Sequence, residues 1–370
     1  MHLAKKKIRS YIRAQNIRKT DKIFRDKIAH LKKADRYVPF PDEQVKPIVY
    51  NFPIYRSQYK LYLDFYHSVL EKADKNFLPN PIYYNHIEPL LNNIKQLQAF
   101  KDKNFYDMFL KGVKTPFTII RKINGSFYNS AYYKIELDEF GLITLTQNLE
   151  NIILKPSIDS GGGMSIQLFQ NDKGRFYSGG KQLTVEMLKS YPDFVLQEVI
   201  IQHPFYRRFN PESNNTIRVF TYRSVIDEKV QILHRLLRIG KRGAFTDHDN
   251  LGGIVIGINE QQELNPYGFD INGTKIMNFN SIELSNRTKA PFLEEAETIA
   301  SSIAQIIFYG RILAFDFSID QNGDAVLLEI NGWRNGISQY QMNNGALFGN
   351  FTEEILSYCR GKDYNHVLTI

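Results

Sequence analysis

The chain has 370 residues, of which 43% are hydrophobic and 23% are charged. This is the composition of a folded globular protein with enough core for roughly two or three lobes, and it excludes a disordered or fibrous chain. The single cysteine, Cys359, excludes an internal disulfide framework, and no run of about 18 apolar residues is present to span a bilayer.

The positive charge is concentrated at the N-terminus. Residues 1–37 contain 13 Lys and Arg against 3 Asp, a net charge of +10, whereas the whole chain carries +8, so residues 38–370 sum to −2. Apolar residues recur among these charges at loosely helical spacing. The segment therefore predicts one basic helix over residues 1–37, with Ile8, Ile12, Ile17, Ile23, Phe24, Ile28 and Leu31 as its apolar positions.

Three interpretations of this helix remain open. It packs on the body with a solvated face, or residues 1–34 lie on an anionic membrane surface, where each basic residue is worth ~1 kcal/mol. Nucleic-acid binding is the third, but the basic run lacks interleaved aromatics and a recognition motif, so we predict no nucleic-acid partner. Because no apolar segment typical of a secretory signal is present, we predict a cytoplasmic protein, which the second interpretation puts at the inner face of the membrane.

Residues 38–115 are predicted to form a helical N-terminal region that begins with a linker. Residues 38–56 are punctuated by four prolines, which indicates a connection that wraps the body. Helical patterns follow over residues 59–70 and 87–97.

From residue 117 to about 200 the pattern predicts short strands and one helix, over residues 184–191. A strand ending in Lys155-Pro156 is followed by the glycine-rich segment Ser160-Gly-Gly-Gly163 and another apolar strand. Glycines let backbone N–H groups turn toward an anion, and a lysine at a strand end supplies a point charge. No Gly-Lys-Ser/Thr sequence follows, so this is not a P-loop, and a plain glycine-rich hairpin turn is the alternative.

The next strand, over residues 194–201, is interrupted by Gln197-Glu198 and followed by His203-Pro204. Such a strand end offers backbone groups and a carboxylate to an adenine, with apolar neighbours on both sides of the ring. A buried strand with a polar edge is the alternative.

Residues 205–355 are dominated by predicted strands, with helices over residues 292–308 and 351–359. Within this region Asp316 lies on one strand, Asn322-Gly323 makes a tight turn, and Glu329 and Asn331 share one face of the return strand. Three hard oxygen ligands on one rigid face suit a Mg²⁺ that also holds nucleotide phosphates. The alternative is that these are the acidic neighbours that Asn-Gly turns often carry.

The order of a strand lysine, a glycine-rich loop, an adenine-type edge and Asp…Glu-x-Asn resembles the ATP-grasp superfamily. More closely, an ordered set of motifs resembles the sugar-transfer-associated ATP-grasp family, which is linked to bacterial surface-polysaccharide synthesis. The resemblance covers roughly residues 95–355 and rests on Gln197-Glu198, Gln202-His203-Pro204, Asn215-Thr216-Ile217-Arg218, Asp249-Asn250-Leu251-Gly252-Gly253 and Leu328-Glu329-Ile330-Asn331. It implies an α+β fold in which two α+β lobes, residues 116–203 and 204–370, clamp ATP.

The resemblance also implies roles for individual residues. Two lysines of the family contact the ATP phosphates; Lys155 matches the second, and Lys103, in an Asp-Lys pair before a Gly-Val-x-x-Pro turn, matches the first. The loop over the phosphates would comprise Ser160, Gly161, Gly162 and Gly163. The adenine site would comprise Gln197, Glu198, Val199 and Ile200, with His203 near the ribose. The Mg²⁺ ligands would be Asp316, Glu329 and Asn331.

One departure concerns the arginine that D-alanine–D-alanine ligases carry two residues before the first metal aspartate, where this chain has Ala314. In those ligases the arginine steadies the tetrahedral intermediate. We predict that Arg218 or Arg238 takes this catalytic role here, alongside Lys155. Asn250 and Gly252, in the loop after Arg238, and Arg334, after the metal triplet, are predicted to lie near substrate; surface salt bridges are the alternative for the arginines.

Together these features predict an enzyme with ATP and Mg²⁺ as cofactors. The leading hypothesis is a carboxylate–amine ligase that forms an acyl phosphate on a sugar-linked or amino-acid substrate. One alternative is a kinase that phosphorylates a sugar or polyol hydroxyl, and the other is a non-catalytic, nucleotide-binding membrane adaptor. The substrates and the oligomeric state do not follow from the sequence.

Overall fold

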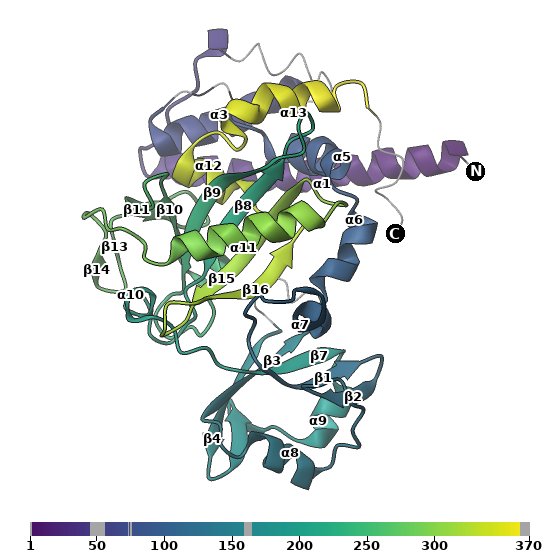
Figure 1. Cartoon of the computed structure of the whole chain (residues 1–370). Helices are drawn as coiled ribbons and strands as arrows, with labels where there is room; N and C mark the ends of the chain where they lie inside the picture. Colours follow the sequence, from purple (N-terminus) through teal and green to yellow (C-terminus); the bar gives the residue numbers. More distant parts are fainter. Residues whose placement is uncertain (1, 45–55, 73, 75, 159–164, 363–370) are drawn as a thin grey trace.

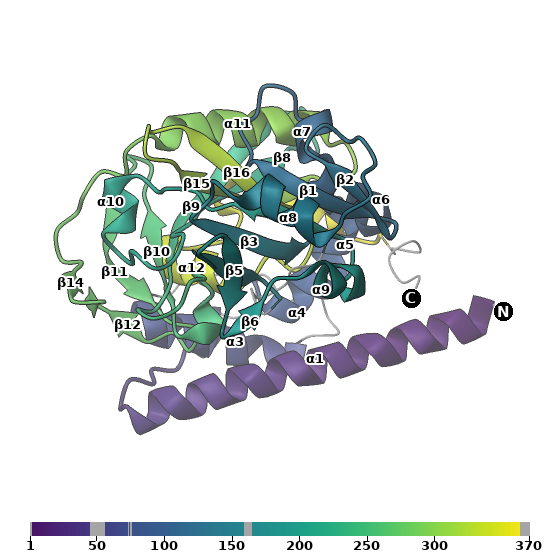
Figure 2. The same cartoon turned by 90° about the horizontal axis from the view of Figure 1, so that it is seen from below.

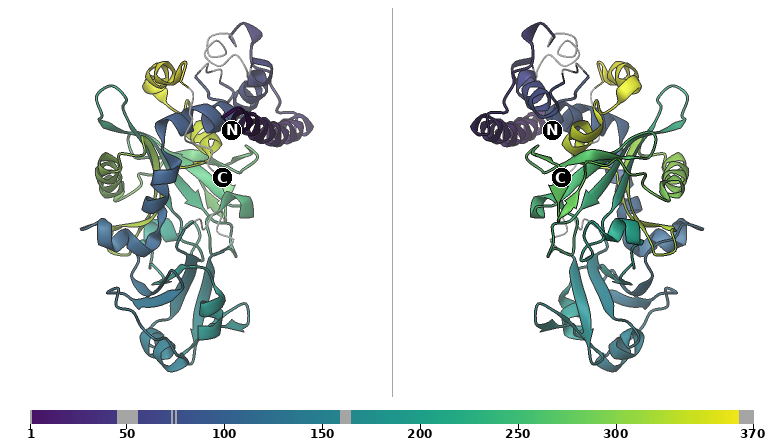
Figure 3. Two further views of the ribbon diagram at one scale, coloured as in Figure 1. Left: turned by 90° about the vertical axis from the view of Figure 1, so that its right-hand side faces the viewer. Right: turned by 90° about the vertical axis from the view of Figure 1, so that its left-hand side faces the viewer.

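The computed structural model describes residues 2–44, 56–72, 74, 76–158 and 165–362. Two seven-stranded antiparallel sheets form its framework, each with its own hydrophobic core and helices (Figure 1). The small sheet and the large sheet follow one another along the long axis of the molecule, with the N-terminal helices beyond the large sheet (Figure 3). The predicted α+β class, with a helical N-terminal region, is therefore confirmed.

The small sheet has the strand order β2-β1-β7-β3-β4-β5-β6. Its strands are β1 (Thr118–Ile123), β2 (Ser126–Asn129), β3 (Asn151–Pro156), β4 (Gln167–Asp172), β5 (Arg175–Ser178), β6 (Lys181–Gln182) and β7 (Phe194–Glu198). Helices α8 (Glu139–Thr146) and α9 (Val185–Ser190) accompany it. The prediction of a single helix in this region was wrong, since both α8 and α9 are present. The sequence of α8 did not indicate a helix because it contains several β-branched residues, which favour strands, and a glycine. Its N-cap, Asp138, accepts a hydrogen bond from the Gly141 N–H at 2.7 Å and fixes the start of the helix.

The large sheet has the order β12-β11-β10-β9-β8-β15-β16. Its strands are β8 (Ile217–Arg223), β9 (Val230–Ile239), β10 (Ile254–Ile258), β11 (Leu264–Phe269), β12 (Lys275–Ile276), β15 (Ile312–Ile319) and β16 (Ala325–Asn331). Strand alternation turns Val219 and Leu237 toward α11 (Leu293–Ile306), whereas Phe220 and Leu236 face the N-terminal helices and α12 (Ile337–Asn344). The large sheet is thereby covered on both faces.

Short elements complete the chain. They are η1 (Asp42–Gln44), α4 (Asn80–Ile82), η3 (Tyr83–Ile87), α5 (Glu88–Leu91), α6 (Ile94–Leu97), η4 (Gln98–Lys101), η5 (Lys103–Phe105), α7 (Tyr106–Phe109), α10 (Pro204–Arg207), η7 (Asp249–Leu251), β13 (Asn278–Phe279), β14 (Ile282–Glu283), η8 (Gly349–Phe351) and α13 (Thr352–Cys359). The predicted helices over 184–191, 292–308 and 351–359 correspond to α9, α11 and α13, whereas the pattern over 87–97 is broken into α5 and α6.

The predicted basic helix is confirmed as α1 (His2–Lys33). Its C-terminal half packs on α3 (Arg56–Leu70), with Phe24, Ile28 and Leu31 buried in the same core. Its N-terminal end extends past the other elements in two perpendicular views (Figures 1 and 2). None of the described helices is long and apolar enough to cross a membrane. Residues 45–55 of the predicted linker lie outside the described residues.

Candidate functional site

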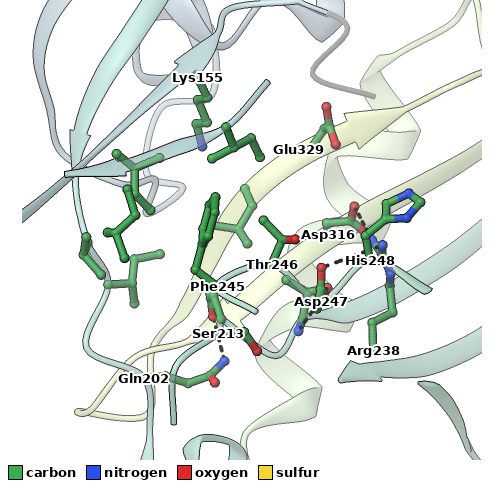
Figure 4. A pocket seen from close by; sticks show the side chains of 18 of the residues that line it. Lys155, Gln202, Ser213, Arg238, Phe245, Thr246, Asp247, His248, Asp316 and Glu329 are labelled. Atoms are coloured by element: carbon green, nitrogen blue, oxygen red, sulfur yellow. Dashed lines mark hydrogen bonds and ion pairs between the residues drawn. The ribbon is translucent and has the colours of Figure 1, made fainter. Parts of the chain in front are cut away.

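A cleft of about 1330 Å³ separates the two sheets. One wall comes from β3 and β7 of the small sheet, and the other from β8, β9, β15 and β16 of the large sheet together with the loops after β9 and β16. Lys155 points into the cleft from β3, opposite Glu329 and Asp316 on the large sheet (Figure 4). Residues far apart in sequence thus face one another across a single cavity.

Asp316, Glu329 and Asn331 form one group on the β15–β16 hairpin. Asp316 is directly paired with Glu329, and the pairing then shifts so that Phe317 faces Leu327, which leaves Leu328 as a bulge. A bulge re-aims neighbouring side chains, and Leu328, Glu329 and Asn331 all line the cleft. The Asn331 amide donates to Asp316 Oδ2 at 3.3 Å. The predicted turn is present, with Gly323 at φ 93°.

A cation from another element accompanies each carboxylate. Arg218, on the neighbouring strand β8, donates through Nε and Nη2 to the two oxygens of Asp316, both at 2.6 Å. Lys103 Nζ donates to Glu329 Oε1 at 2.9 Å from a side chain that is only 4% exposed. Burial alone would raise the pKa of Glu329, but Lys103, Arg218 and Lys155 outweigh it and hold this pKa at about 2.

Lys155 is a second buried lysine in the cleft, and its charge is destabilised by its surroundings. Burial, together with repulsion from Lys103, lowers the pKa of Lys155 to about 7, against a smaller opposing effect of Glu329. A polyanion bound beside these two lysines would offset their mutual repulsion and favour the charged form of Lys155. The structure thus brings two cations close together in the cleft, an arrangement that suits a bound anion.

Arg238, on β9, lies between two carboxylates. Its Nη1 is 3.6 Å from Asp316 Oδ2 and its Nη2 is 3.7 Å from Asp247 Oδ1. Asp247 is in turn bound by the backbone N–H of Thr216 at 3.2 Å and by the Thr216 hydroxyl. Burial, then the charge of Arg238, lowers the pKa of His248 beside it. Arg238 is therefore oriented by Asp247 but held at long distance, which leaves its guanidinium able to bind an incoming anion.

The donor set fits a hard divalent cation. Two carboxylates and one amide on adjacent positions of a rigid hairpin are the ligands that Mg²⁺ prefers, with phosphate oxygens and water completing its shell. Arg218 and Lys103 provide the compensating positive charge in this structure. Among the described residues, no group of three or more His, Cys, Asp and Glu side chains is arranged to hold a metal ion, so the candidate site on this hairpin has two acidic members, Asp316 and Glu329.

On the nucleotide side, Gln197, Glu198, Val199 and Ile200 all line the cleft. The Gln197 amide is bound within the sheet, donating to Thr118 Oγ1 at 2.9 Å. β7 ends at Glu198, so the backbone of Val199 and Ile200 lies beyond the end of the strand.

Only some of the other predicted site residues line the cleft. Asn250 and Arg334 line the cleft, but Gly252 is not among its described lining residues. His203 is also absent from that lining; its Nδ1 caps α10 by accepting from Phe205 N–H, and its ring packs against Phe292. Ser160, Gly161, Gly162 and Gly163 lie outside the described residues.

The cleft is also lined by residues to which the sequence analysis assigned no role of their own, namely Thr216, Asp247, Trp333, Asn335 and Gln339. Trp333 and Asn335 flank Arg334, which was predicted to lie near substrate. The Asn-Thr-Ile-Arg motif already pointed to Thr216, because it contains this residue. Asp247 gave none, because a loop aspartate next to His248 and Asp249 is indistinguishable by pattern from a solvated one.

The two lobes, the lysine pair and the Asp…Glu-x-Asn hairpin define an ATP-grasp protein. The family described as "Sugar-transfer associated ATP-grasp" matches residues 84–355, and the chain belongs to that family. No curated protein matches the chain.

Three solved structures with low sequence identity are also similar to part of the chain. The ATP-grasp ligase PsnB complexed with minimal precursor is 12% identical over 72% of this chain and 63% of its own, with a TM-score of 0.39. N5-carboxyaminoimidazole synthetase from Staphylococcus aureus complexed with ADP is 13% identical over 73% and 54%, with a TM-score of 0.41. The D-alanine–D-alanine ligase from Coxiella burnetii is 10% identical over 70% and 57%, with a TM-score of 0.37. The chain thus spans about half to two thirds of the length of these proteins.

Proposed function

We propose that the protein is an ATP- and Mg²⁺-dependent carboxylate–amine ligase that forms an acyl phosphate on a sugar-linked or amino-acid substrate. The observation that carries this proposal is the grouping, in one cleft, of the Asp316–Glu329 carboxylate pair with Lys103, Lys155 and Arg238. Joining two anions, a carboxylate and a γ-phosphate, requires this mixture of cations and metal-binding carboxylates.

ATP is the first substrate in this proposal. Lys103 and Lys155 bind its phosphates, and the charged form of Lys155 is restored by that binding. The backbone after Glu198 accepts and donates to the adenine edge, with Val199 and Ile200 against the ring.

Asp316, Glu329 and Asn331 would hold Mg²⁺. When bound, the ion neutralises phosphate charge and polarises the transferred phosphoryl group. Because Arg218 and Lys103 already neutralise the two carboxylates, occupation of the site exchanges one set of cation contacts for another. Arg218 would then be able to direct its donors to phosphate or substrate oxygens.

The chemistry proceeds in two balanced steps. A substrate carboxylate oxygen attacks the γ-phosphorus while the bond to the ADP oxygen breaks, giving an acyl phosphate. An amine nitrogen then attacks the carbonyl carbon, phosphate leaves with its bonding electron pair, and the amine loses a proton to solvent. Arg238 aligns the carboxylate and stabilises the oxyanion of the second step, oriented for this by Asp247.

We assign the reaction to surface-polysaccharide synthesis at the cytoplasmic face of a membrane. The sugar-transfer description of the family supports this setting. The net charge of +10 in residues 1–37 and the projection of α1 beyond the body support contact with anionic lipid (Figure 2).

The test is to incubate the protein with Mg-ATP, pooled amino acids, pooled uronic-acid sugar nucleotides and hydroxylamine, and to measure ADP, free phosphate and hydroxamate together. ADP with hydroxamate is the expected result, because hydroxylamine traps an activated carboxyl group. ADP with neither free phosphate nor hydroxamate would replace the ligase by a kinase. No ADP from any pool would favour a nucleotide-binding adaptor.

A further inference from the structure

The segment that leaves the metal-binding strand forms one end of the cleft. Residues 332–336 follow Asn331 directly and lead into α12, and Trp333, Arg334, Asn335 and Gln339 line the cleft. The Gln339 amide donates to Asp249 Oδ2 at 3.0 Å, which joins this wall to the loop after β9. The wall is therefore built from two loops fastened to one another beside Arg238.

This wall contains unsatisfied polar groups. Asn335 is 3% exposed, yet neither its amide nitrogen nor its amide oxygen has a hydrogen-bond partner among the described residues. The Gln339 side-chain oxygen is likewise without one. Buried amides are nearly always paired in folded proteins, because an unpaired one forfeits its hydrogen bonds to water. An Asn that lines a cleft with both ends of its amide unpaired is poised for a ligand.

The backbone of the same segment is also unfavourable. Arg334 has a φ of 56°, in the left-handed region that residues with a Cβ rarely adopt, and Gly336 follows at 65°. Such conformations persist where the surroundings require them and are concentrated at ligand-binding sites. An unpaired buried amide at Asn335 and an unfavourable backbone conformation at Arg334 are thus adjacent in sequence, just after the candidate metal ligands.

We propose that Trp333, Asn335 and Gln339 form a subsite for the hydroxylated ring of an acidic sugar, whose carboxylate points to Arg238. An amide offers a donor and an acceptor side by side, which matches two adjacent ring hydroxyls. The half-buried Trp333 indole covers the apolar face of the ring. This inference rests on the proposed function, since it names the class of carboxylate that is activated.

The wall is less suited to an α-amino acid. An ammonium group would need a free, charged carboxylate near Asn335. Asp249 is already hydrogen-bonded to Gln339 and lies 3.4 Å from His248. Glu88 accepts from the backbone N–H groups of Arg334 and Asn335 and from the Tyr83 hydroxyl, and burial raises the pKa of Glu88 to about 8, which favours its neutral form. Ring hydroxyls need no charged partner, so neutral amides satisfy them fully.

The sequence supplies its own reporter, because Trp333 is the single tryptophan of the chain. We would titrate the full-length protein, with Mg²⁺ and a non-hydrolysable ATP analogue, with D-glucuronate, D-galacturonate and D-mannuronate, and follow tryptophan fluorescence. Cyclohexanecarboxylate, which keeps the ring and the carboxylate but lacks hydroxyls, is the control ligand. At least one uronate is expected to bind about tenfold or more tightly than the control. UDP-glucuronate and methyl glucuronoside, added in separate arms, distinguish a nucleotide-linked from a glycan-linked sugar.

Asn335→Leu tests the amide itself. It is expected to weaken uronate binding about tenfold, to leave cyclohexanecarboxylate binding unchanged, and to raise the melting temperature, because an unpaired buried amide is removed. Asn343→Leu is the matched control: Asn343 is buried in α12 but does not line the cleft, so the preference for uronates should persist. Equal uronate affinity in Asn335→Leu and wild type, or no uronate preference at all, would overturn the subsite.

The readouts separate this inference from the proposed function. Fluorescence reports binding without turnover, so uronate binding without ADP formation would support the subsite and count against the ligase. Hydroxamate formation from amino acids without uronate binding would do the reverse.

Discussion

Arg218 and Asp316 lie directly opposite each other on adjacent strands, and the guanidinium binds both carboxylate oxygens at 2.6 Å. The ligase pattern has its arginine two residues before this aspartate, where this chain has the buried Ala314. Since Arg218 reaches the same carboxylate from β8, the neighbouring strand supplies the cation that the metal strand lacks. This pair is therefore both a structural contact and part of the candidate metal site.

Replacing Arg218 by Met should destabilise the protein by about 3 kcal/mol, the cost of leaving a buried carboxylate without its partner. Arg218 is well suited to this test because its side chain is only 18% exposed and Asp316 raises its pKa well above the ordinary value despite burial. Urea unfolding measures the effect.

The control is Arg218→Met combined with Asp316→Asn, which removes the uncompensated charge and should recover much of the loss. Mg²⁺ should also stabilise Arg218→Met more than wild type, because the ion replaces the missing cation. A loss below about 1 kcal/mol, the value of an exposed pair, would contradict the buried-pair interpretation.

Glu329→Gln should lower turnover by about a hundredfold or more while leaving the fold intact, since it removes a charged ligand from the candidate metal site. Initial rates of ADP release at saturating Mg²⁺, with circular dichroism for the fold, measure it. Glu353→Gln, at an exposed position of α13, is the matched control and should be neutral. Near wild-type turnover in Glu329→Gln would remove Glu329 from the metal site.

Lys155 predicts a pH dependence of nucleotide binding. Its pKa of about 7 in the free protein means that it is largely neutral at pH 8.5, and bound phosphates raise that pKa. Binding at pH 8.5 must therefore take up a proton, and affinity should fall as pH rises above 7, by at most tenfold per pH unit. Calorimetry at pH 8.5 in two buffers of different ionisation enthalpy measures the proton uptake.

Lys155→Arg is the control, because a guanidinium stays charged throughout this range. It should bind nucleotide with little dependence on pH beyond that of the nucleotide itself. Equal proton uptake by the variant and wild type would show that Lys155 is already charged in the free protein.

Local pattern predicted much of this molecule. The hairpin that bears Asp316 and Glu329 follows from alternation and an Asn-Gly turn, and α1 and α11 follow from helical periodicity. α8 was missed because its β-branched residues favour a strand, and its capping hydrogen bond outweighs that preference. The Thr216–Asp247 hydrogen bond and the packing of His203 against Phe292 depend on how segments distant in sequence pack, which no local spacing encodes. The lobe boundaries at residues 116–203 and 204–370 stay predictions.

The basic helix predicts binding to anionic membranes, and its packing decides how that is tested. Removing all of residues 1–34 would delete Phe24 and Leu31 from the core, so the change must stop earlier. Replacing Lys5, Lys6, Lys7, Arg9 and Arg13 by Gln removes five of the 13 basic residues of this segment and preserves helix propensity. Sedimentation with phosphatidylserine-containing vesicles at low salt should weaken by at least about tenfold, because each basic residue near such a surface is worth ~1 kcal/mol.

Pure phosphatidylcholine vesicles and high salt are the controls, since both remove the electrostatic attraction and should equalise the two proteins. Nucleotide affinity should be unchanged, because the substituted residues lie in the first half of α1 and no α1 residue is among the described lining residues of the cleft. Sedimentation that is the same for both proteins on anionic vesicles would return α1 to a purely structural role, in which Phe24, Ile28 and Leu31 anchor a solvated helix.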